Sequence, residues 1–372
     1  MHRVRHLTVA AATVLAALAT AAPAMAGGGD RGGGAVYTLT NSASGNAVAV
    51  FSRAADGSLT ADGTVSTGGI GTSAGLGSQG ALVLDGRRLF AVNAGSNTIS
   101  ALRVGRGGKV TLTDVAASRG AKPISLTVRG RLLYVLNAGD AETPANIHGF
   151  RVVHGELVAL PGSSRPLSTA SPDPAQIEFT PNGRHLVVTE KATNRIVTYR
   201  VGPFGYTGGP NAQPSAGETP FGFAFDRRGL LIVSEAFGGA PDASVLSSYR
   251  VTPGGIVSAV DPNVATTETA ACWVVVTKDG RYTYTTNTGS NSISGYAIGS
   301  DGGLTLLDPD GRTAATGASP LDAALSRASR FLYTLNGGAN EIQAFAVNRD
   351  GSLDVLGTVG GLPVGVAGLA AS

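Results

Sequence analysis

The sequence predicts an all-β fold, a seven-bladed β-propeller closed by its own C-terminal strand, and three observations predict it. A unit of about 49 residues recurs seven times along the chain, a spacing typical of four-stranded propeller blades. Each unit reads as four short β-branched or aromatic runs separated by Gly-bearing turns, which is the pattern of a strand meander. The two chain ends do not fit the repeat frame, because the first unit lacks its first strand and the last residues resemble a spare one.

The repeat is aligned on the residue that ends the second strand of each unit, which we call the anchor position. The seven anchor positions are Asn41, Asn93, Asn137, Glu190, Glu235, Asn287 and Asn336. Asn commonly ends a strand and opens a polar turn, since it accepts unusual backbone angles and bonds nearby backbone groups. A meander places every anchor on the same face of the ring as the loop that leads into the first, innermost strand.

The other elements recur in order around the anchors. First strands begin near Pro123, Pro174, Pro220, Cys272, Pro320 and Pro363. Gly turns such as Asp279-Gly280 follow, because Gly accepts a positive φ at no steric cost. Third strands are expected over residues 99–104, 147–152, 196–201, 245–251, 293–298 and 342–347, and a further Gly turn leads to each fourth strand.

Closure of the ring follows from the chain ends. The first unit starts with its second strand at Ala35, and residues 363–370 resemble a first strand such as residues 320–326. We therefore expect the C-terminus to supply the inner strand of blade one. This arrangement pairs two sheet edges that would otherwise be exposed.

The N-terminal residues are predicted to lie outside the propeller. Arg3 and Arg5 precede an apolar run over residues 7–22, and Ala24, Met25 and Ala26 give the small-x-small pattern of a signal-peptidase site. We expect a signal peptide at residues 1–26, a flexible Gly-rich leader at 27–34 and a propeller at 35–372. The protein is then secreted or extracellular after cleavage behind Ala26.

Charge and cysteine content exclude several classes of function. Lys plus Arg number 28 and Asp plus Glu 25, and removal of the signal peptide leaves 26 against 25. A nearly neutral chain without runs of like charge does not indicate a nucleic-acid binder. The single Cys272 excludes an internal disulfide, so the core alone must hold an exported protein together. The sequence contains no HExxH, GxSxG, Walker, paired-Cys or dinucleotide-binding motif.

Two anchors depart from Asn, and these are the candidate catalytic residues. Glu190 and Glu235 occupy the anchor positions of the adjacent blades four and five. Neighbouring carboxylates on one rim can bind a cation, hold sugar hydroxyls or act as general acid and base. The alternative is that they are solvated acids paired with neighbours such as Lys191 or Arg195.

Five further residues are candidates for substrate binding: Gln176, Phe221, Trp273, Asp322 and Asn287. Gln176 and Asp322 lie near the start of a first strand and are expected beside the central channel, where Trp273 is placed to stack on a sugar or to pack in the core. Cys272 has no His nearby in the sequence and is interpreted as a packed residue, and His148 falls within a predicted third strand and is interpreted as a blade residue. His185 begins a predicted second strand and is expected to be a solvated edge residue.

The repeated Tyr-x-x-Asn endings, seen at residues 134–137, 284–287 and 333–336, occur together with Asp-Gly turns. In this the sequence resembles the lactonase family of seven-bladed propellers (YVTN-type repeats), which includes 6-phosphogluconolactonase and carboxymuconate cyclase-like enzymes. The resemblance implies a site of His and Arg residues at the start of the middle inner strands, with a Glu nearby. Glu235 matches that Glu, whereas Gln176, Phe221 and Gly222 stand where the family has His or Arg.

The resemblance implies a secreted lactonase-like hydrolase or lactonising enzyme acting on a small sugar-derived or aromatic lactone, with Glu235 and Glu190 as polarising and acid–base groups. The alternative is a non-catalytic extracellular propeller that recognises a glycan, a cell-wall component or a protein. Whether the chain is an enzyme stays open at this point. We expect a monomer with a small lactone or carbohydrate ligand, no nucleic-acid partner, no membrane span, and no cofactor or metal beyond a cation at the rim carboxylates.

Overall fold

The computed structural model describes residues 32–372. The predicted signal peptide and nearly all of the predicted leader lie outside the described residues. Gly34 already belongs to the first strand, so the propeller begins one residue before its predicted start. Within residues 32–372 no helix is long and apolar enough to cross a membrane.

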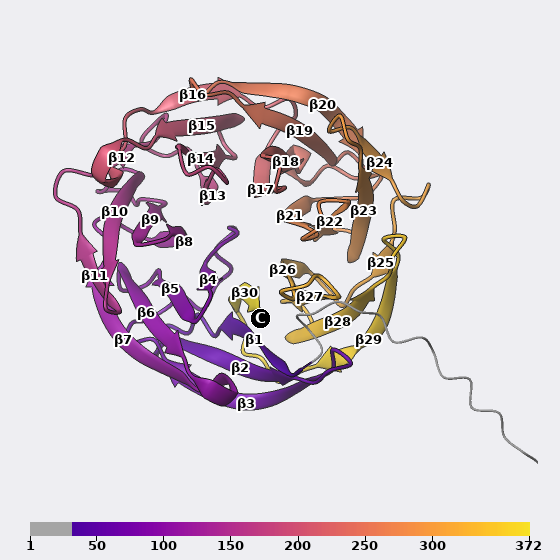
Figure 1. Ribbon diagram of the computed structural model, residues 1–372, viewed down its shortest axis with the longest axis horizontal. Helices are drawn as coiled ribbons and strands as arrows, with labels where there is room; N and C mark the ends of the chain where they lie inside the picture. The colour runs from indigo at the N-terminus through magenta and orange to yellow at the C-terminus, as the bar shows by residue number, and fades with distance from the viewer. Residues whose placement is uncertain (1–31) are drawn as a thin grey trace, which may run out of the picture.

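Seven antiparallel sheets form a ring around a central channel, as the repeat predicts (Figure 1). Numbered from the innermost strand outward, blade 1 contains β30 (Ala367–Ala371), β1 (Gly34–Leu39), β2 (Ala47–Arg53) and β3 (Leu59–Ser66); blade 2 contains β4 (Leu82–Asp85), β5 (Arg88–Asn93), β6 (Thr98–Val104) and β7 (Val110–Ala117); blade 3 contains β8 (Pro123–Arg129), β9 (Leu132–Asn137), β10 (Asn146–Val153) and β11 (Glu156–Ala159), with β12 (Arg165–Pro166) beside β10.

The remaining blades follow the same order. Blade 4 contains β13 (Pro174–Phe179), β14 (His185–Glu190), β15 (Arg195–Arg200) and β16 (Asn211–Pro214); blade 5 contains β17 (Pro220–Phe225), β18 (Leu230–Glu235), β19 (Val245–Val251) and β20 (Val257–Ala265); blade 6 contains β21 (Ala271–Val276), β22 (Tyr282–Asn287), β23 (Ser292–Ile298) and β24 (Leu304–Leu306), with β25 (Ala314–Ala315) beside β23; blade 7 contains β26 (Pro320–Leu325), β27 (Phe331–Asn336), β28 (Glu341–Val347) and β29 (Leu353–Val359).

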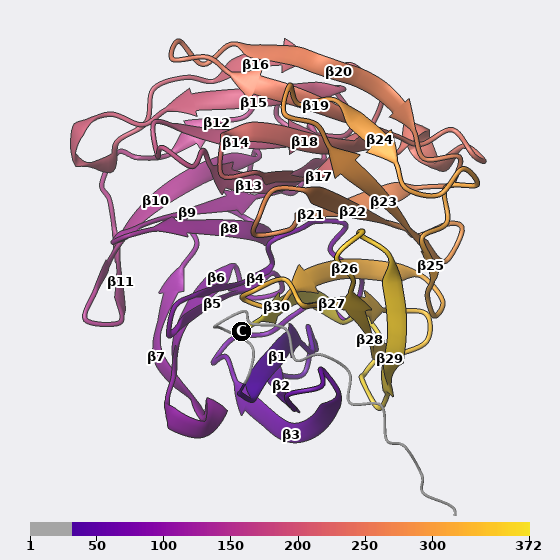
Figure 2. The same cartoon turned by 45° about the vertical axis from the view of Figure 1, so that its right-hand side comes forward.

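The ring closes as predicted, with β30 as the inner strand of blade 1 (Figure 2). β30 pairs antiparallel with β1, and Thr38 lies opposite Leu369. The Thr38 hydroxyl donates to the Gly368 carbonyl at 2.7 Å, and the Ser372 amide donates to the Ala35 carbonyl at 2.9 Å. The strand is shorter than expected, because Pro363 and the next three residues form a loop before Ala367.

Each inner strand of blades 3 to 7 begins in the same way. The residue before it has a left-handed backbone with φ between 50° and 58°, and these residues are Lys122, Asp173, Thr219, Ala270 and Ser319. The carbonyl of this residue accepts a hydrogen bond from the backbone amide of the residue that follows the anchor of the same blade. In blade 5, for example, the Ala236 amide donates to Thr219 O at 3.0 Å. The register confirms that anchors and first-strand starts share one face, since Pro174 lies opposite Glu190 and Pro220 opposite Glu235.

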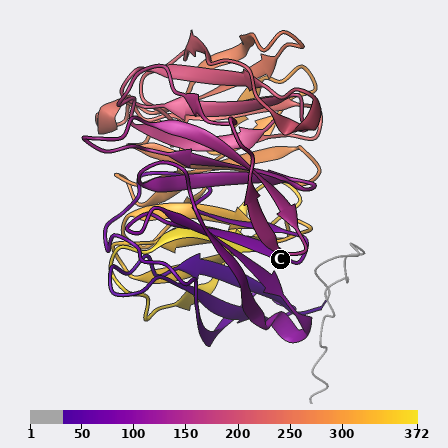
Figure 3. The ribbon, with the colours of Figure 1, turned by 90° about the vertical axis from the view of Figure 1, so that its left-hand side faces the viewer.

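Apolar side chains fill the space between neighbouring sheets. Phe51 and Val36 of blade 1, for example, pack with Phe331 and Tyr333 of blade 7 in one buried cluster. Seen from the side, the sheets are stacked around the ring and the C-terminus lies toward one of its two faces (Figure 3). We call that face the turn face, because it carries the turns between first and second and between third and fourth strands, and we call the opposite one the anchor face.

The Tyr of the Tyr-x-x-Asn motif joins one blade to the next. The hydroxyls of Tyr134, Tyr284 and Tyr333 donate to the carbonyls of Gly205, Gly351 and Gly57, respectively, at 2.7, 2.8 and 3.0 Å. Each of these Gly residues lies in the third-to-fourth-strand turn of the following blade. The motif that carries the family resemblance is therefore an inter-blade contact, which explains why it is specific for the fold.

Candidate functional site

Glu190 is buried at the end of β14 and is surrounded by hydrogen-bond donors. The Ser168 amide donates to Oε1 at 2.9 Å, the Thr193 hydroxyl donates to Oε2 at 2.7 Å, and the Ser168 hydroxyl also donates to Oε2. Ser168 belongs to the segment that leaves the outer strands of blade 3. The carboxylate of Glu190 therefore joins blade 4 to the preceding blade.

Glu235 has an equivalent position in blade 5 and is also buried. Its Oε1 accepts the hydroxyls of Ser215 at 2.6 Å and Tyr249 at 2.5 Å, and its Oε2 accepts the Ser247 hydroxyl at 2.5 Å. Burial first, and then the Glu235 charge, raise the pKa of the Tyr249 hydroxyl, which therefore stays protonated as a donor. Ser215 directly follows the outer strand of blade 4.

The Asn anchors make the same kind of contact. Asn93 accepts the hydroxyl of Thr67, which directly follows the outer strand of blade 1, at 2.7 Å. Asn287 is also buried, but it donates to the hydroxyls of Ser292 and Ser294 within its own blade. Glu190 and Glu235 share no hydrogen-bond partner, and neither of them lines the channel cavity described below. The catalytic role of the two Glu residues and the binding role of Asn287 stay predictions.

Residues 67–81, between β3 and β4, cross the mouth of the channel on the anchor face; we call this segment the channel loop. The Gln79 amide donates to Ala175 O of blade 4 at 3.1 Å, and the Gln79 side chain exchanges two hydrogen bonds with Val274 of blade 6. A Cβ at position 222 would lie 2.2 Å from Gln79 Oε1, so Gly222 leaves room for the side-chain amide of Gln79. The loop thus covers the region where the family resemblance placed His and Arg.

Phe221, Cys272 and Trp273 are buried beneath the channel loop. Trp273 Nε1 donates to Ser78 O at 3.1 Å, and its ring contacts that of Phe221 with centroids 5.1 Å apart. Burial raises the pKa of the Cys272 thiol to about 12, so this group is not a nucleophile at neutral pH. Lys191 lies over the Phe221 ring and donates to Gly77 O at 2.8 Å.

Below the loop, the channel contains a cavity of about 320 Å³ that extends toward the turn face. Gln79 and Gly80 of the loop and inner-strand residues of blades 1, 2, 3, 4 and 7 line it. Three of these lining side chains are chemically notable: Gln176, Glu178 and Asp322. The structure therefore brings together two of the predicted binding residues, Gln176 and Asp322, and adds a carboxyl group that the sequence reading had not singled out.

Asp322 and Glu178 are the acids of the cavity. Burial raises the pKa of Asp322 to about 8, although its two oxygens accept the amides of Ala323 at 2.8 Å and Leu369 at 2.9 Å. Burial also raises the pKa of Glu178 to about 8, while its side chain keeps partial access to the cavity. Gln176 Nε2 lies 3.3 Å from Glu178 Oε2 and also donates to Phe223 O at 2.9 Å. Two acids with strongly raised pKa values in one cavity are typical of a functional site.

Glu178 was recognisable in the sequence from strand alternation. The run Gln176, Ile177, Glu178 places Gln176 and Glu178 on one face of an inner strand, and both residues line the channel cavity. An acid two residues after the predicted channel residue Gln176 is the signal. The channel loop carried no comparable signal, because its Gly- and Ser-rich sequence reads as a connecting segment.

The two strand histidines are structural. His148 is buried, its Nδ1 lies 2.7 Å from the Ser164 hydroxyl, and burial lowers its pKa to about 4. His185 is also buried, and its pKa is lowered in the same way. Within residues 32–372 no group of three or more His, Cys, Asp or Glu side chains is arranged to hold a metal ion.

Comparisons with known proteins agree with this architecture. The family model for "Lactonase, 7-bladed beta-propeller" matches residues 244–366. No curated protein matches the chain. Among solved structures, a protein from Lactobacillus plantarum has a TM-score of 0.73 at 18% identity, with 92% of this chain and 99% of that chain covered.

Other similar structures have a named activity. A candidate 6-phosphogluconolactonase from Bacteroides fragilis has a TM-score of 0.70 at 18% identity and covers 91% of this chain and 98% of its own. The periplasmic gluconolactonase of Pseudomonas aeruginosa has a TM-score of 0.69 at 18% identity and covers 90% and 98%, respectively. The resemblance to the lactonase family of seven-bladed β-propellers is thereby confirmed.

Proposed function

We propose that this protein hydrolyses a small, uncharged, sugar-derived lactone in its channel cavity, with Glu178 and Asp322 as the acid–base pair. The observation that carries the proposal is the placement of two carboxyl groups, each with a pKa raised to about 8, around a cavity of about 320 Å³. The lactonase-type fold supports the reaction class, and the predicted signal peptide and the periplasmic gluconolactonase among the similar structures support export.

The chemistry needs one carboxylate and one carboxylic acid. The carboxylate takes a proton from water, whose oxygen attacks the lactone carbonyl carbon. The carboxylic acid donates its proton to the ring oxygen as the bond between that oxygen and the carbonyl carbon breaks, giving an open-chain hydroxy acid. Two acids that titrate near pH 8 share a single proton most often around that pH, so we expect a bell-shaped rate profile centred there.

The cavity selects against charged substrates. None of the residues lining it is Arg or Lys, and a phosphorylated sugar needs such a partner. The side-chain amide of Gln79 is already bound to the backbone of blade 6, and that of Gln176 to the backbone of blade 5. These two side chains therefore fix the shape of the cavity. Apolar lining residues such as Leu82 and Leu126 match the ring carbons of a neutral lactone.

Activity against a panel of neutral and phosphorylated lactones tests the proposal, with Glu178→Gln and Asp322→Asn measured beside Glu190→Gln and Glu235→Gln. We expect the first pair to lose about 100-fold or more in kcat, as general acid–base groups do. The second pair tests the catalytic role predicted for the anchors. A loss confined to the second pair would move the site to the rim, and preference for a phosphorylated lactone would contradict the cavity assignment.

A non-catalytic binding protein is the second candidate, and one observation favours it. The channel loop covers the inner-strand starts of blades 4 and 5, where Gln79 contacts Ala175 and Gly222 instead of the His and Arg of the family pattern. Calorimetry with a lactone and its hydroxy acid separates the candidates. Binding to the wild type without turnover, abolished by Asp322→Asn, supports a binding propeller.

A further inference from the structure

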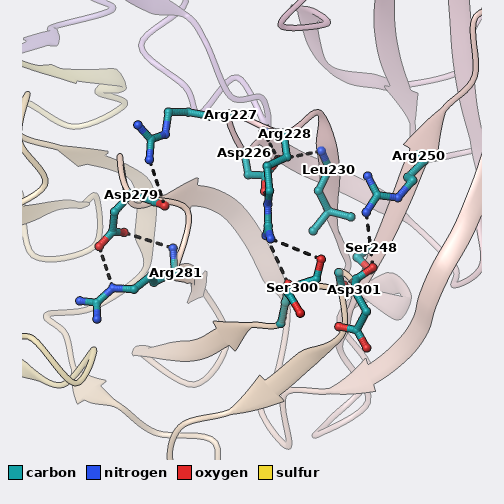
Figure 4. A network of polar contacts seen from close by, with 12 residues as sticks. Asp226, Arg227, Arg228, Leu230, Ser248, Arg250, Asp279, Arg281, Ser300 and Asp301 are labelled. Carbon is teal, nitrogen blue, oxygen red and sulfur yellow. Dashed lines mark hydrogen bonds and ion pairs between the residues drawn. The ribbon is translucent and has the colours of Figure 1, made fainter.

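The turn face gathers positive charge that the sequence as a whole does not reveal. Arg and Lys recur in the turns of this face, and the close-up of blades 5 and 6 shows Arg227, Arg228, Arg250 and Arg281 there together (Figure 4). All four hold backbone carbonyls of the next blade's turn: Arg227 contacts Asp279 O at 3.3 Å, Arg228 contacts Gly299 O at 3.3 Å, Arg250 contacts Asp301 O at 3.4 Å, and Arg281 contacts Arg349 O at 3.0 Å. These contacts explain part of the arginine content.

These carbonyl contacts do not account for all the charged side chains around a groove of about 330 Å³ between the turns of blades 5, 6 and 7. We call it the basic groove. Its charged lining residues are Arg227, Lys278, Asp279, Arg281, Arg330 and Arg349. The one acid is already paired, because Arg281 Nε lies 2.8 Å from Asp279 Oδ2. The other cations give the groove a strong positive charge, although the whole chain is close to neutral.

Two of these cations retain donors for a ligand. Arg227 is exposed, and the one contact its guanidinium makes within residues 32–372 is a hydrogen bond of 3.3 Å to Asp279 O. Lys278 is exposed, and its ammonium group forms no ion pair within the same residues. A third, Arg330, is held over the Phe331 ring at 5.3 Å. Arg227 therefore spends one donor on the turn of blade 6 and keeps its other guanidinium donors for a ligand, and Lys278 keeps its ammonium group.

A second hollow of about 380 Å³ continues from the first toward blade 4. It is lined by Arg250, by Arg228, which is ion-paired with the buried Asp226 at 2.6 Å, and by polar groups such as His185 and Asn182. Arg227 lines both hollows, so Arg227 and Arg250 supply the positive charge of the second one. Arg227 thus joins two adjacent basic depressions into one path across blades 4 to 7. Such a path fits a chain that carries repeated negative charges better than it fits a single small anion.

We propose that the basic groove and its extension bind a linear acidic glycan, a sugar chain with carboxylate groups. Arg pairs with carboxylates in bidentate geometry, and the Ser329 hydroxyl and the side-chain oxygen of Asn348 in the groove suit sugar hydroxyls, whereas the Thr277 hydroxyl is already bonded to Asp279 and Tyr282. Single-stranded nucleic acid fits less well, because it needs exposed aromatic rings for stacking. The one aromatic residue of the groove, Tyr282, is covered by Arg281 at 5.1 Å.

This site is separate from the lactone proposal, since the groove and the channel cavity have no lining residue in common. It also differs from a membrane-binding surface. The exposed apolar residues Phe204 and Ile256 lie in turns of blades 4 and 5 and line neither hollow. A concave path lined by Arg selects a chain rather than a flat bilayer.

Binding of polygalacturonate to the purified protein, followed by calorimetry at two salt concentrations, tests this proposal. The test variant is Arg227→Ser with Lys278→Ser, and the matched control is Arg106→Ser with Lys109→Ser. The control pair is also exposed and lies in the third-to-fourth-strand turn of blade 2, so it removes the same charge far from the groove. Thermal unfolding of both variants checks that the fold is retained.

We expect the groove variant to weaken binding roughly tenfold or more and the control roughly twofold or less, with weaker binding at higher salt. An equal loss in both variants would show diffuse attraction to the face and overturn the groove. Absence of polygalacturonate binding at low salt would also overturn it. Tighter binding of single-stranded DNA or of anionic phospholipid vesicles, lost in the groove variant, would replace the glycan by that class of partner.

Discussion

At the scale of single residues, the same carboxyl chemistry serves two different purposes in this propeller. Glu190 and Glu235 are surrounded by hydroxyl and amide donors, which satisfy each carboxylate and connect neighbouring blades. Asp322 is buried and Glu178 half-buried beside a cavity, and desolvation raises the pKa values of both. Desolvation beside a cavity, rather than a contact between blades, thus sets Glu178 and Asp322 apart from the two anchor acids.

Glu178 should make stability depend on pH. Its pKa rises from 4.5 in the unfolded chain to about 8 in the folded protein. Between these values the folded state holds one more proton, so the free energy of unfolding falls as pH rises and the loss is complete above the folded pKa. Glu178→Gln removes this dependence, and the variant should gain stability relative to the wild type as pH rises.

Differential scanning calorimetry from pH 4.5 to 9 checks this. We expect the two proteins to unfold at similar temperatures at the acidic end, and the variant to unfold at a higher temperature at the alkaline end, by roughly 2 °C for each kcal/mol of the difference in stability. Asp322 titrates in both proteins, so its contribution to the pH dependence cancels in the difference between their unfolding temperatures. A constant offset across the pH range would mean that Glu178 does not titrate as inferred.

At the scale of elements, each blade is joined to the next on both faces. On the anchor face, Asn97, Asn194 and Asn291 have left-handed backbones and accept the amides of Lys122, Thr219 and Ser319, the residues that precede the next inner strand. On the turn face, the hydroxyl of a Tyr or an equivalent side chain reaches the next turn Gly. Ser248 replaces Tyr in blade 5, and its hydroxyl donates to Gly302 O at 2.7 Å.

Tyr284→Phe tests the contact on the turn face. Tyr284 is buried and donates to Gly351 O at 2.8 Å, so its loss leaves a buried carbonyl without this donor. We expect a cost of roughly 1–2 kcal/mol in the free energy of unfolding, measured by urea denaturation. Tyr206→Phe is the control, because Tyr206 is exposed, and it should cost less than about 0.5 kcal/mol. Equal effects of the two changes would contradict the role of Tyr284.

The position of the channel loop can be followed by tryptophan fluorescence. Trp273 is the single Trp of the chain, and its indole nitrogen donates to Ser78 O of the loop, so its fluorescence responds to displacement of the loop. Gln79→Ala removes both side-chain bonds to Val274. We expect a red-shifted Trp emission and stronger acrylamide quenching than in the wild type.

The matched control for the loop is Gln213→Ala. Gln213 makes the same kind of amide bridge, from blade 4 to Gly255 and Val257 of blade 5, but on the turn side away from Trp273. We expect the control to leave the emission unchanged while it lowers stability by a similar amount. Unchanged emission in Gln79→Ala would show that the loop stays in place without its Gln79 bridge.

At the scale of the whole molecule, the sequence was sufficient where the repeat is local and insufficient where distant segments meet. The seven blades and the closing strand follow from the repeated turns and from the frame shift between the ends. The channel loop could not be predicted, because residues 67–81 owe their path to Ala175, Ile124 and Val274 of other blades. The basic groove could not be predicted either. Counting charges along the chain does not show that alternate turns of the meander lie on one face of the ring, where their charges gather.

Ring closure is the feature of the whole molecule that the sequence predicted from its ends, and deletion of residues 367–372 tests it. The deletion removes β30, its pairing with β1, the bond from the Ser372 amide to Ala35 O and the bond from the Ala35 amide to the Ser372 hydroxyl oxygen. It also exposes the buried side chains of Val36 and Leu39. Because blade 1 would be left with three strands and an open inner edge, we expect the unfolding temperature to fall by more than about 10 °C and the protein to aggregate on heating.

Thr38→Val tests the same ring closure with a smaller change than the deletion. It keeps β30 and removes one bond, from the Thr38 hydroxyl to Gly368 O at 2.7 Å. A loss of roughly 1 kcal/mol is expected from such a buried bond. Hydrogen exchange then distinguishes closure from general destabilisation, because faster exchange should be confined to β1 and β30 in this variant. Uniformly faster exchange over all seven blades would mean that the ring unfolds as one unit and that closure is not a separate step.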